Sequence, residues 1–289
     1  MNVWILVFIL LSVAVSLPPF LGKRFFRNRV APHQTDPGEL NIPFQEVWIP
    51  TRNRRRLYGW WMEDHTAGPS PVIILVHGWG RNTERMLPYI KNLVNRGYHL
   101  IAFDSRNHGS SDPDQFSSML KFAEDIEAVI TWLSKNPRVN SQAVGLVGLS
   151  IGGAASLYAA SQNPSVRAVV TVGAFADPVT MMDLEFRKHH IPRFPLPWLM
   201  YRYIEYLSRK RIRTFAPVNN MQIVQAPVLL VHNTDDATVP YSEALRLKKA
   251  GDPERVELWT QEGYGHSNGH EHPDFWPRIT TFFYEHLKG

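Results

Sequence analysis

One serine in the sequence lies between two glycines, in a setting that suits a nucleophile. Gly148-Leu149-Ser150-Ile151-Gly152 follows an apolar run and precedes an alanine-rich one, so it joins a predicted strand to a predicted helix. A sharp turn of this kind brings backbone segments so close that residues without a Cβ are needed on both sides. Such a turn exposes the serine hydroxyl beside the positive end of the helix. The alternative is a tight turn with a capping serine.

The segments on either side of this serine alternate between apolar strands and helices. Continuous apolar strands that alternate with helices predict a mostly parallel sheet covered on both faces, with ligands at the carboxyl ends of its strands. The predicted strands occupy 71–78, 99–104, 143–150, 166–175, 226–233 and 254–260, and the predicted helices 85–98, 119–137, 151–164, 239–251 and 273–289.

Two segments depart from this alternation. Residues 44–62 contain two apolar stretches around an arginine-rich turn, which predicts a hairpin whose arginines face solvent or contact anionic lipid. Residues 176–225 are aromatic, basic and interrupted by prolines, which predicts a helical insertion. This insertion is either an ordinary solvated cap, or a surface that covers an apolar acyl chain or contacts a membrane.

The N-terminal residues differ in kind from the rest. Asn2–Leu21 contains no charged side chain and is followed by a basic stretch. A span of about 20 apolar residues crosses a membrane, so residues 1–22 predict an anchor. Residues 23–43 are then a basic juxtamembrane stretch and linker, residues 44–289 are the folded domain, and the basic stretch favours a cytoplasmic domain. The alternatives are a cleaved signal peptide, which would make the protein secreted, and a buried N-terminal helix.

Composition limits the other functions. The chain has 289 residues, of which 44% are hydrophobic, and this suffices for a large core. Because it has no cysteine, disulfides and thiolate metal sites are excluded. The formal net charge of +5 is mild and does not indicate a nucleic-acid partner. We therefore expect a small-molecule substrate, with membrane contact through the N-terminal segment.

The G-x-S-x-G turn and the alternating elements together resemble the α/β-hydrolase family, in a membrane-anchored form of bacterial type. The resemblance covers Phe44 to the C-terminus, and residues 176–225 resemble the variable cap of that family. It implies an α/β-hydrolase fold with a mostly parallel central sheet, helices on both faces and a helical cap insertion. A serine at this turn argues against branches that use aspartate there, such as dehalogenases and epoxide hydrolases. The family order of catalytic residues is serine, acid, histidine.

The resemblance places the acid after a late strand. The Val239-Pro240 pair matches the end of the family's acid loop and favours Asp236 over Asp235. Asn233 stands where that family usually has glycine, which leaves the register of the loop open. Either aspartate could instead cap the helix that follows.

The resemblance places the base in the last loop. His266 matches the family's Gly-x-x-His pattern because it lies three residues after Gly263 and directly after Gly265. His270 and His272 lie close by and compete for the same role. The alternative for such a group of histidines is a metal site, but the surrounding residues match no known metal-ligand spacing.

Two backbone N–H groups are implied as donors to a developing oxyanion. His77-Gly78-Trp79-Gly80 resembles the family's His-Gly-x-Gly turn, which makes the Trp79 N–H one donor, and the residue after the nucleophile, Ile151, supplies the other. We interpret His77 as support for this loop. The run 104–112 resembles a further family loop, and its charged residues are interpreted as scaffolding.

These residues predict a serine hydrolase that works by two-step acyl transfer. Ser150 attacks a carbonyl, His266 accepts its proton and Asp236 orients the imidazole, with no cofactor and no metal. A carboxylic ester is the leading substrate. A serine peptidase is the alternative, because Gly153 directly after the motif also resembles the α/β-hydrolase peptidases. A non-catalytic binding protein on this scaffold is the third class.

Overall fold

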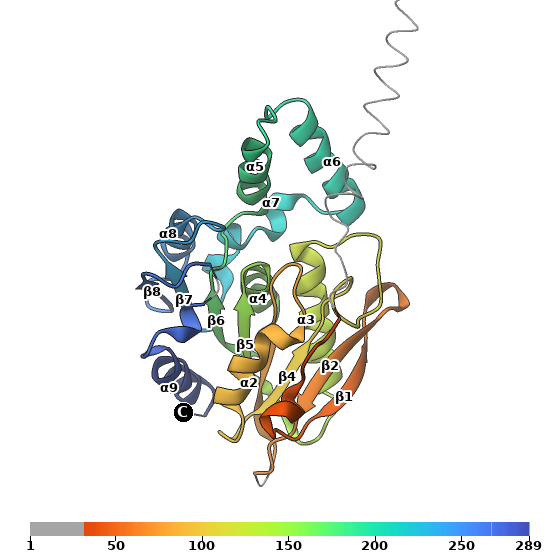
Figure 1. Cartoon of the computed structure of the whole chain (residues 1–289), viewed down its shortest axis with the longest axis vertical. Coiled ribbons are helices and arrows are strands. Elements are labelled where there is room, and N and C mark those ends of the chain that lie inside the picture. The colour runs from red at the N-terminus through yellow and green to blue at the C-terminus, as the bar shows by residue number, and fades with distance from the viewer. Residues whose placement is uncertain (1–31, 67, 267, 289) are drawn as a thin grey trace, which may run out of the picture.

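The computed structural model describes residues 32–66, 68–266 and 268–288. The strands are β1 (Gln45–Pro50), β2 (Arg56–Met62), β3 (Ser70–Val76), β4 (His99–Phe103), β5 (Val139–Leu149), β6 (Val166–Val172), β7 (Val228–Asn233) and β8 (Val256–Gln261). In this described part they form one eight-stranded sheet in the order β1-β2-β4-β3-β5-β6-β7-β8 (Figure 1). Strand β2 pairs antiparallel with β1 and with β4, and every later neighbour pairs in parallel.

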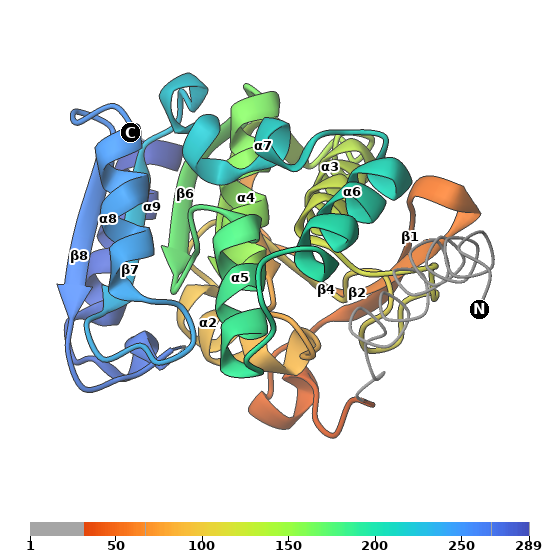
Figure 2. The ribbon, with the colours of Figure 1, turned by 90° about the horizontal axis from the view of Figure 1, so that it is seen from above.

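Helices cover both faces of the sheet (Figures 1 and 2). One face is covered by α2 (Leu87–Leu93) and α9 (Phe275–Leu287), and the other by α3 (Met119–Leu133), α4 (Ile151–Gln162) and α8 (Tyr241–Ala250). Helix α3 begins where the Ser118 hydroxyl accepts a hydrogen bond from the backbone N–H of Lys121, as expected of an N-cap serine.

Side chains of the central strands alternate between these two layers. In β3, Val72, Ile74 and Val76 pack toward α3 and α4, whereas Ile73 and Leu75 pack toward α2 and α9, and all five are fully buried. Strands buried on both faces need apolar residues at every position, which explains the continuous apolar run in the sequence. The prediction of a mostly parallel sheet with helices on both faces is confirmed.

Between β6 and β7 the chain forms helices α5 (Pro178–Lys188), α6 (Leu196–Ser208) and α7 (Ile212–Phe215). Helix α5 starts at Asp177, whose carboxylate accepts a hydrogen bond from the Val179 N–H at 2.9 Å, with Pro178 at the first helical position. These helices lie above the carboxyl ends of the central strands (Figure 1). They therefore cover the edge of the sheet at which β5 ends with Leu149.

The predicted membrane-anchored localisation requires a correction. A spanning helix needs about 20 apolar residues. Among residues 32–66, 68–266 and 268–288, no helix has the length and apolar character to cross a membrane, and the longest described α-helix, α3, has 15 residues. This finding contradicts the prediction. The segment on which the anchor and signal-peptide interpretations depended, Asn2–Leu21, lies outside the described residues.

The described part of the predicted linker packs against the domain. His33 Nε2 lies 3.0 Å from Asp104 Oδ2, and the backbone N–H groups of Gln34 and Thr35 both donate to the Glu84 carboxylate. Burial lowers the pKa of His33, but its hydrogen bond to Asp104 and the nearby carboxylates outweigh that effect and raise the pKa. This segment is therefore held against the residues that follow β3 and β4.

Candidate active site

Ser150 occupies a strained turn between β5 and α4. Its backbone angles, φ 53° and ψ −118°, lie in a region that residues other than glycine rarely adopt. A Cβ at Gly148 would lie 2.5 Å from the carbonyl oxygen of Gly152, and a Cβ at Gly152 would lie 2.5 Å from the carbonyl oxygen of His77. Both glycines are therefore required by close backbone contacts, as the sequence pattern predicts.

Asp236 and His266 form a close pair at the same edge of the sheet. His266 Nδ1 lies 2.7 Å from Asp236 Oδ2, and the other carboxylate oxygen accepts the N–H groups of Thr238 and Val239 at 2.9 and 2.8 Å. Burial raises the pKa of Asp236, but the His266 contact and these backbone bonds outweigh it and lower the pKa below its usual value. An ionised Asp236 thus fixes Nδ1 of His266 as the protonated nitrogen.

The end of β6 places the His266 ring beside Ser150. The Ser150 N–H donates to the Val172 carbonyl at 2.8 Å, so the next residue, Gly173, is a neighbour of Ser150. A Cβ at Gly173 would lie 2.6 Å from the carbonyl oxygen of His266 and 3.1 Å from its Nδ1. Among the described residues, no hydrogen bond joins Ser150 Oγ to the His266 ring.

Asp235 has a different role from that of Asp236. Its carboxylate accepts the N–H groups of Gly263 and Gly265, at 3.1 and 3.2 Å, and so shapes the loop that carries His266. Adjacent aspartates therefore divide two tasks, since one contacts the imidazole and the other holds its loop. This role of Asp235 was not predicted from the sequence, although the pair of glycines before His266 is visible there.

His77 supports the loop that carries Trp79. Its Nδ1–H donates to the Gly78 carbonyl at 2.7 Å, and its Nε2 accepts the Ser105 N–H at 3.0 Å. Full burial lowers the pKa of His77, which keeps the ring neutral. A Cβ at Gly78 would lie 3.6 Å from the Ser150 Cβ, so the Trp79 loop passes directly beside the serine.

Ile151 is the first residue of α4, and the first N–H groups of a helix have no acceptor within it. Both predicted oxyanion donors, Trp79 and Ile151, therefore flank Ser150.

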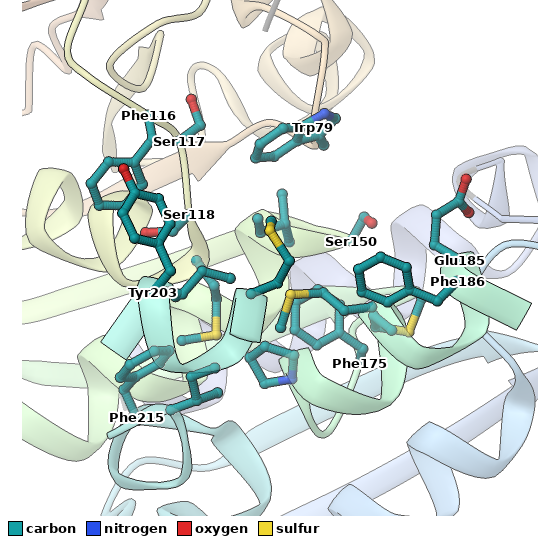
Figure 3. Close-up of a pocket in the computed structure, with 18 of the residues that line it drawn as sticks. Trp79, Phe116, Ser117, Ser118, Ser150, Phe175, Glu185, Phe186, Tyr203 and Phe215 are labelled. Atoms are coloured by element: carbon teal, nitrogen blue, oxygen red, sulfur yellow. The ribbon is translucent and has the colours of Figure 1, made fainter. Parts of the chain in front are cut away.

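Ser150 opens into a cavity of about 700 Å³ beneath the cap helices (Figure 3). The lining is mostly apolar and comes from the Trp79 loop, the loop before α3, and the helices α5, α6 and α7. Its large apolar side chains include Trp79, Phe116, Met119, Phe175, Met181, Met182, Phe186, Met200, Ile204 and Phe215. Its volume is in the range of ordinary small-molecule sites.

Comparison with known proteins identifies the family. A family model described as the alpha/beta hydrolase fold matches residues 71–221, which is more than half of the chain. The chain belongs to this family. The fold predicted from the G-x-S-x-G turn and the strand–helix alternation is therefore confirmed.

A curated relative, an uncharacterized 31.7 kDa protein in the traX-finO intergenic region of Escherichia coli, is 37% identical over 109 residues, or 37% of this chain and 38% of that protein. The match thus spans well under half of that relative.

Solved structures of other proteins share this architecture. An esterase of Pyrococcus furiosus, Pf2001, superposes with a TM-score of 0.71 at 21% identity, covering 90% of this chain and 99% of that chain. A puromycin-hydrolyzing peptidase of Mycobacterium tuberculosis superposes with a TM-score of 0.67 at 16% identity, covering 85% of this chain and 39% of that chain. At these identities the similarity establishes the fold alone.

The other histidines near the site contact aromatic side chains. The His270 ring lies 5.8 Å from the ring of Tyr89, and the His272 ring lies 5.2 Å from the ring of Trp259. Within the described residues, no group of three or more histidine, aspartate or glutamate side chains could hold a metal ion. Neither histidine makes the contact to Asp236 that His266 makes.

His232 is a neighbour of the Asp236 pair that the sequence analysis missed. Its Nε2 lies 2.9 Å from the Val239 carbonyl oxygen and 3.4 Å from Asp236 Oδ2, and burial lowers its pKa. A neutral His232 therefore donates its Nε2–H to this carbonyl and stiffens the loop of Asp236. Its position inside an apolar strand gave no signal of that role.

Proposed function

We propose that this protein is a serine hydrolase that cleaves carboxylic esters with apolar acyl groups. The observation that carries the proposal is the Asp236–His266 pair beside a strained Ser150 that opens into an apolar cavity. A nucleophile, an orienting carboxylate and a base are the combination that acyl transfer uses, and Ser150, Asp236 and His266 follow one another in the chain order of this family.

In the first step, Ser150 Oγ attacks the ester carbonyl while His266 accepts its proton at Nε2. Asp236 holds the Nδ1–H of the ring at 2.7 Å and stabilises the imidazolium that forms. The lowered pKa of Asp236 favours this role, because the carboxylate stays ionised throughout the neutral range. A rotation of the serine side chain when the ester binds would complete the Ser150–His266 hydrogen bond.

In the second step, His266 donates its proton to the departing alcohol and the acyl group remains on Ser150. Water, deprotonated by His266, then attacks this acyl-enzyme and releases the acid. The N–H groups of Trp79 and Ile151 would stabilise the negative oxygen in both tetrahedral intermediates. Donors of this kind contribute about 10²- to 10³-fold each in well-studied hydrolases.

The lining of the cavity favours an ester over a peptide. A peptide brings backbone N–H and C=O groups, each of which costs free energy when it is buried without a partner. The lining of the cavity is mostly apolar and includes several phenylalanine and methionine side chains, which suit an alkyl or aromatic acyl group. The similarity of fold to a peptidase makes peptide cleavage the competing function.

A substrate panel with matched variants tests the proposal. We would compare p-nitrophenyl esters of increasing acyl length with aminoacyl p-nitroanilides, on the wild type, Ser150→Ala and Ser161→Ala. Ser161 is the matched control because it lies on the same helix, with its hydroxyl bound to the Tyr158 carbonyl. We expect ester turnover that Ser150→Ala lowers by at least about 10³-fold and Ser161→Ala leaves unchanged. Turnover that survives Ser150→Ala, or a preference for the anilides, would refute the proposal.

A further inference from the structure

A second cavity, of about 580 Å³, lies beside the first. The two cavities share the lining residues Gln115, Phe116, Ser118 and Leu207, which we call the shared wall. Figure 3 shows Phe116 and Ser118 across the first cavity from Ser150. A substrate chain that starts at Ser150 and crosses the first cavity therefore ends at the shared wall.

The second cavity differs from the first in its charge. Its ionisable lining residues are the cations Arg52, Arg55, Lys121 and Arg209 and the acids Asp114 and Glu124. Lys121 Nζ lies 2.8 Å from Asp114 Oδ2, and Arg52 Nε lies 3.8 Å from Glu124 Oε1. The lining thus has more positive than negative side chains.

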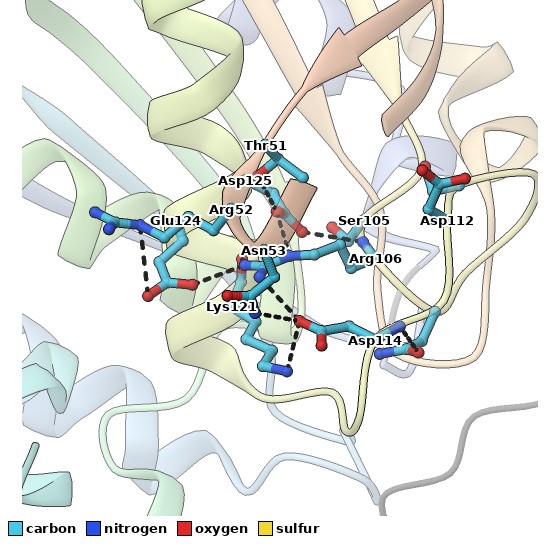
Figure 4. A network of polar contacts seen from close by, with 12 residues as sticks. Thr51, Arg52, Asn53, Ser105, Arg106, Asp112, Asp114, Lys121, Glu124 and Asp125 are labelled. Carbon is cyan, nitrogen blue, oxygen red and sulfur yellow. Dashed lines mark hydrogen bonds and ion pairs between the residues drawn. The ribbon is translucent and has the colours of Figure 1, made fainter. Parts of the chain in front are cut away.

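Both acids also pair with Arg106, which does not line the cavity (Figure 4). The fully buried Arg106 places its two terminal nitrogens 3.1 Å from Asp114 and 2.8 Å from Glu124. Burial raises the pKa of Asp114, but the bonds from Lys121 and neighbouring groups outweigh it and lower the pKa to about 2. Both acidic side chains of the lining are therefore already paired with cations, namely Lys121, Arg52 and Arg106.

Two cations remain for a ligand. Arg55, at the end of the β1–β2 turn, and Arg209, at the end of α6, form no ion pair among the described residues. Both are exposed, and they come from different parts of the fold that both line this cavity. Guanidinium groups from two directions suit the oxygens of a carboxylate or a phosphate.

We propose that the second cavity binds an anionic group at the far end of the substrate. The substrate class is then an amphiphilic ester, in which an apolar chain fills the first cavity and a terminal carboxylate or phosphate reaches Arg55 and Arg209. This inference rests on the proposed ester hydrolysis for the position of Ser150. The competing explanation is that these arginines only make the surface soluble and bind no ligand.

The length dependence of catalysis tests the proposal. We would measure kcat/KM for p-nitrophenyl monoesters of α,ω-dicarboxylic acids and for p-nitrophenyl esters of monocarboxylic acids, over matched chain lengths. A short chain leaves its carboxylate in the apolar cavity, where it is disfavoured. A longer chain brings the carboxylate past the shared wall. We expect the dicarboxylate-to-monocarboxylate ratio to rise with length and pass through a maximum. A ratio that stays low at every length would overturn the proposal.

Variants locate the effect. The double variant Arg55→Gln/Arg209→Gln should lower this ratio at the favoured length by about tenfold, as expected when charge-assisted contacts at a partly exposed site are lost. At position 209, Arg209→Lys should keep part of the ratio that Arg209→Gln loses, because lysine carries the charge without the planar fork of arginine. Arg54→Gln is the matched control, since Arg54 is exposed in the same turn but does not line the cavity. An equal loss in Arg54→Gln would overturn the site.

Direct binding separates this inference from the proposed function. Calorimetric titration of Ser150→Ala with monomethyl dodecanedioate, which keeps one terminal carboxylate, and with methyl dodecanoate, which has none, needs no turnover. We expect the preference for the carboxylate-bearing ligand to disappear in the Arg55→Gln/Arg209→Gln background even if no ester is cleaved. Inorganic phosphate is the third probe, and competition with the carboxylate-bearing ligand alone would place the anion in the second cavity. Equal binding of the two ligands, unaffected by the arginine changes, would refute the site whatever the esters show.

Discussion

Two fully buried aspartates, Asp236 and Asp125, are held in different ways. Asp236 lies in a loop at the sheet edge and bonds to His266 and to the N–H groups of Thr238 and Val239. Asp125 lies in α3 and bonds to the side chain and backbone N–H of Arg106, at 2.7 and 3.0 Å, and to the Thr51 hydroxyl. Neither carboxylate has exposed side-chain surface, and each has three hydrogen-bond donors in reach.

The partners of these aspartates differ in what they can do. The His266 side chain is 22% exposed, and an imidazole can accept and donate a proton, whereas Arg106 is 1% exposed and always charged. The first pair can therefore take part in proton transfer. The second pair can only fix the loop before α3, which forms a wall of both cavities. Burial and bonding are thus similar for the two aspartates, and the partner of each decides what the pair can do.

The largest predicted effect is on catalysis at Asp236. Asp236→Asn would keep the shape of the site but favour the wrong tautomer of His266, so kcat should fall by about 10³- to 10⁴-fold. The free energy of unfolding should change far less than kcat. Asp235→Asn is the matched control, because Asp235 contacts only the loop backbone. Assays with a p-nitrophenyl ester measure kcat of both variants. Equal losses of kcat would contradict the division of roles between the two aspartates.

The next effect is on stability at Arg106. Arg106→Met would leave Asp125 buried without its cation and would remove one of the two cations beside Asp114, and we expect a loss of about 3–5 kcal/mol in the free energy of unfolding. Urea titration measures this loss. Arg138→Met is the control, because Arg138 pairs with Glu63 at the surface and should cost at most about 1 kcal/mol. Similar losses in the two variants would show that the Arg106 cluster does not fix this part of the fold.

The two aspartates should also differ in the sign of their pH dependence. Burial raises the pKa of Asp125 to about 6 despite Arg106, so the folded state holds this proton more tightly than the unfolded state. Its contribution to stability is full below the unfolded pKa of about 3.9 and is lost as pH rises through about 6. The lowered pKa of Asp236 has the opposite sign, since its contribution is present above about 3.9 and lost at lower pH.

Unfolding curves between about pH 4 and pH 7 test this difference. In the wild type, the free energy of unfolding should fall as pH rises over that range. Asp125→Asn should remove this fall, and Asp236→Asn should leave it in place. The slope is the readout, so a uniform loss of stability in either variant does not affect the test. A slope that Asp125→Asn leaves unchanged would contradict the assignment.

The smallest predicted effect concerns the spacing around His266. Gly173→Ala would add a methyl group 2.6 Å from the His266 carbonyl oxygen and 3.1 Å from its Nδ1, so the backbone and ring of His266 must shift. We expect a loss of about 10- to 100-fold in kcat. Gly68→Ala is the matched control, because Gly68 also has a positive φ but has nothing within 4 Å of an added Cβ. If both variants lose activity equally, backbone strain alone explains the result.

Much of the fold could be predicted because it depends on local patterns. The run from Val72 to Val76 is apolar at every position, which only a strand buried on both faces requires. The glycines around Ser150 were equally informative, because the turn between β5 and α4 leaves no room for a Cβ. For Asp236 and His266 the structure brings together the two side chains that the sequence predicted, and their catalytic role stays a prediction.

Other features depend on contacts between distant segments and could not be predicted. Asp235 reaches the loop of His266, and Gly173 lies against its ring, only after β6, β7 and β8 have paired. The predicted linker gave no sign that His33 would bind Asp104, because nothing in a polar stretch identifies its partner. The shared wall between the two cavities likewise forms only when α6 packs over the loop before α3.

The central claim is that Ser150 is a nucleophile activated by His266. The most direct test is covalent labelling with a fluorophosphonate, located by peptide mass spectrometry, on the wild type, Ser150→Ala and His266→Ala. We predict a single label on the peptide that contains Ser150, which is absent in Ser150→Ala and at least about 10²-fold slower in His266→Ala. A label on another residue, or no label on a folded and ligand-accessible wild type, would contradict the claim and favour a binding protein on this scaffold.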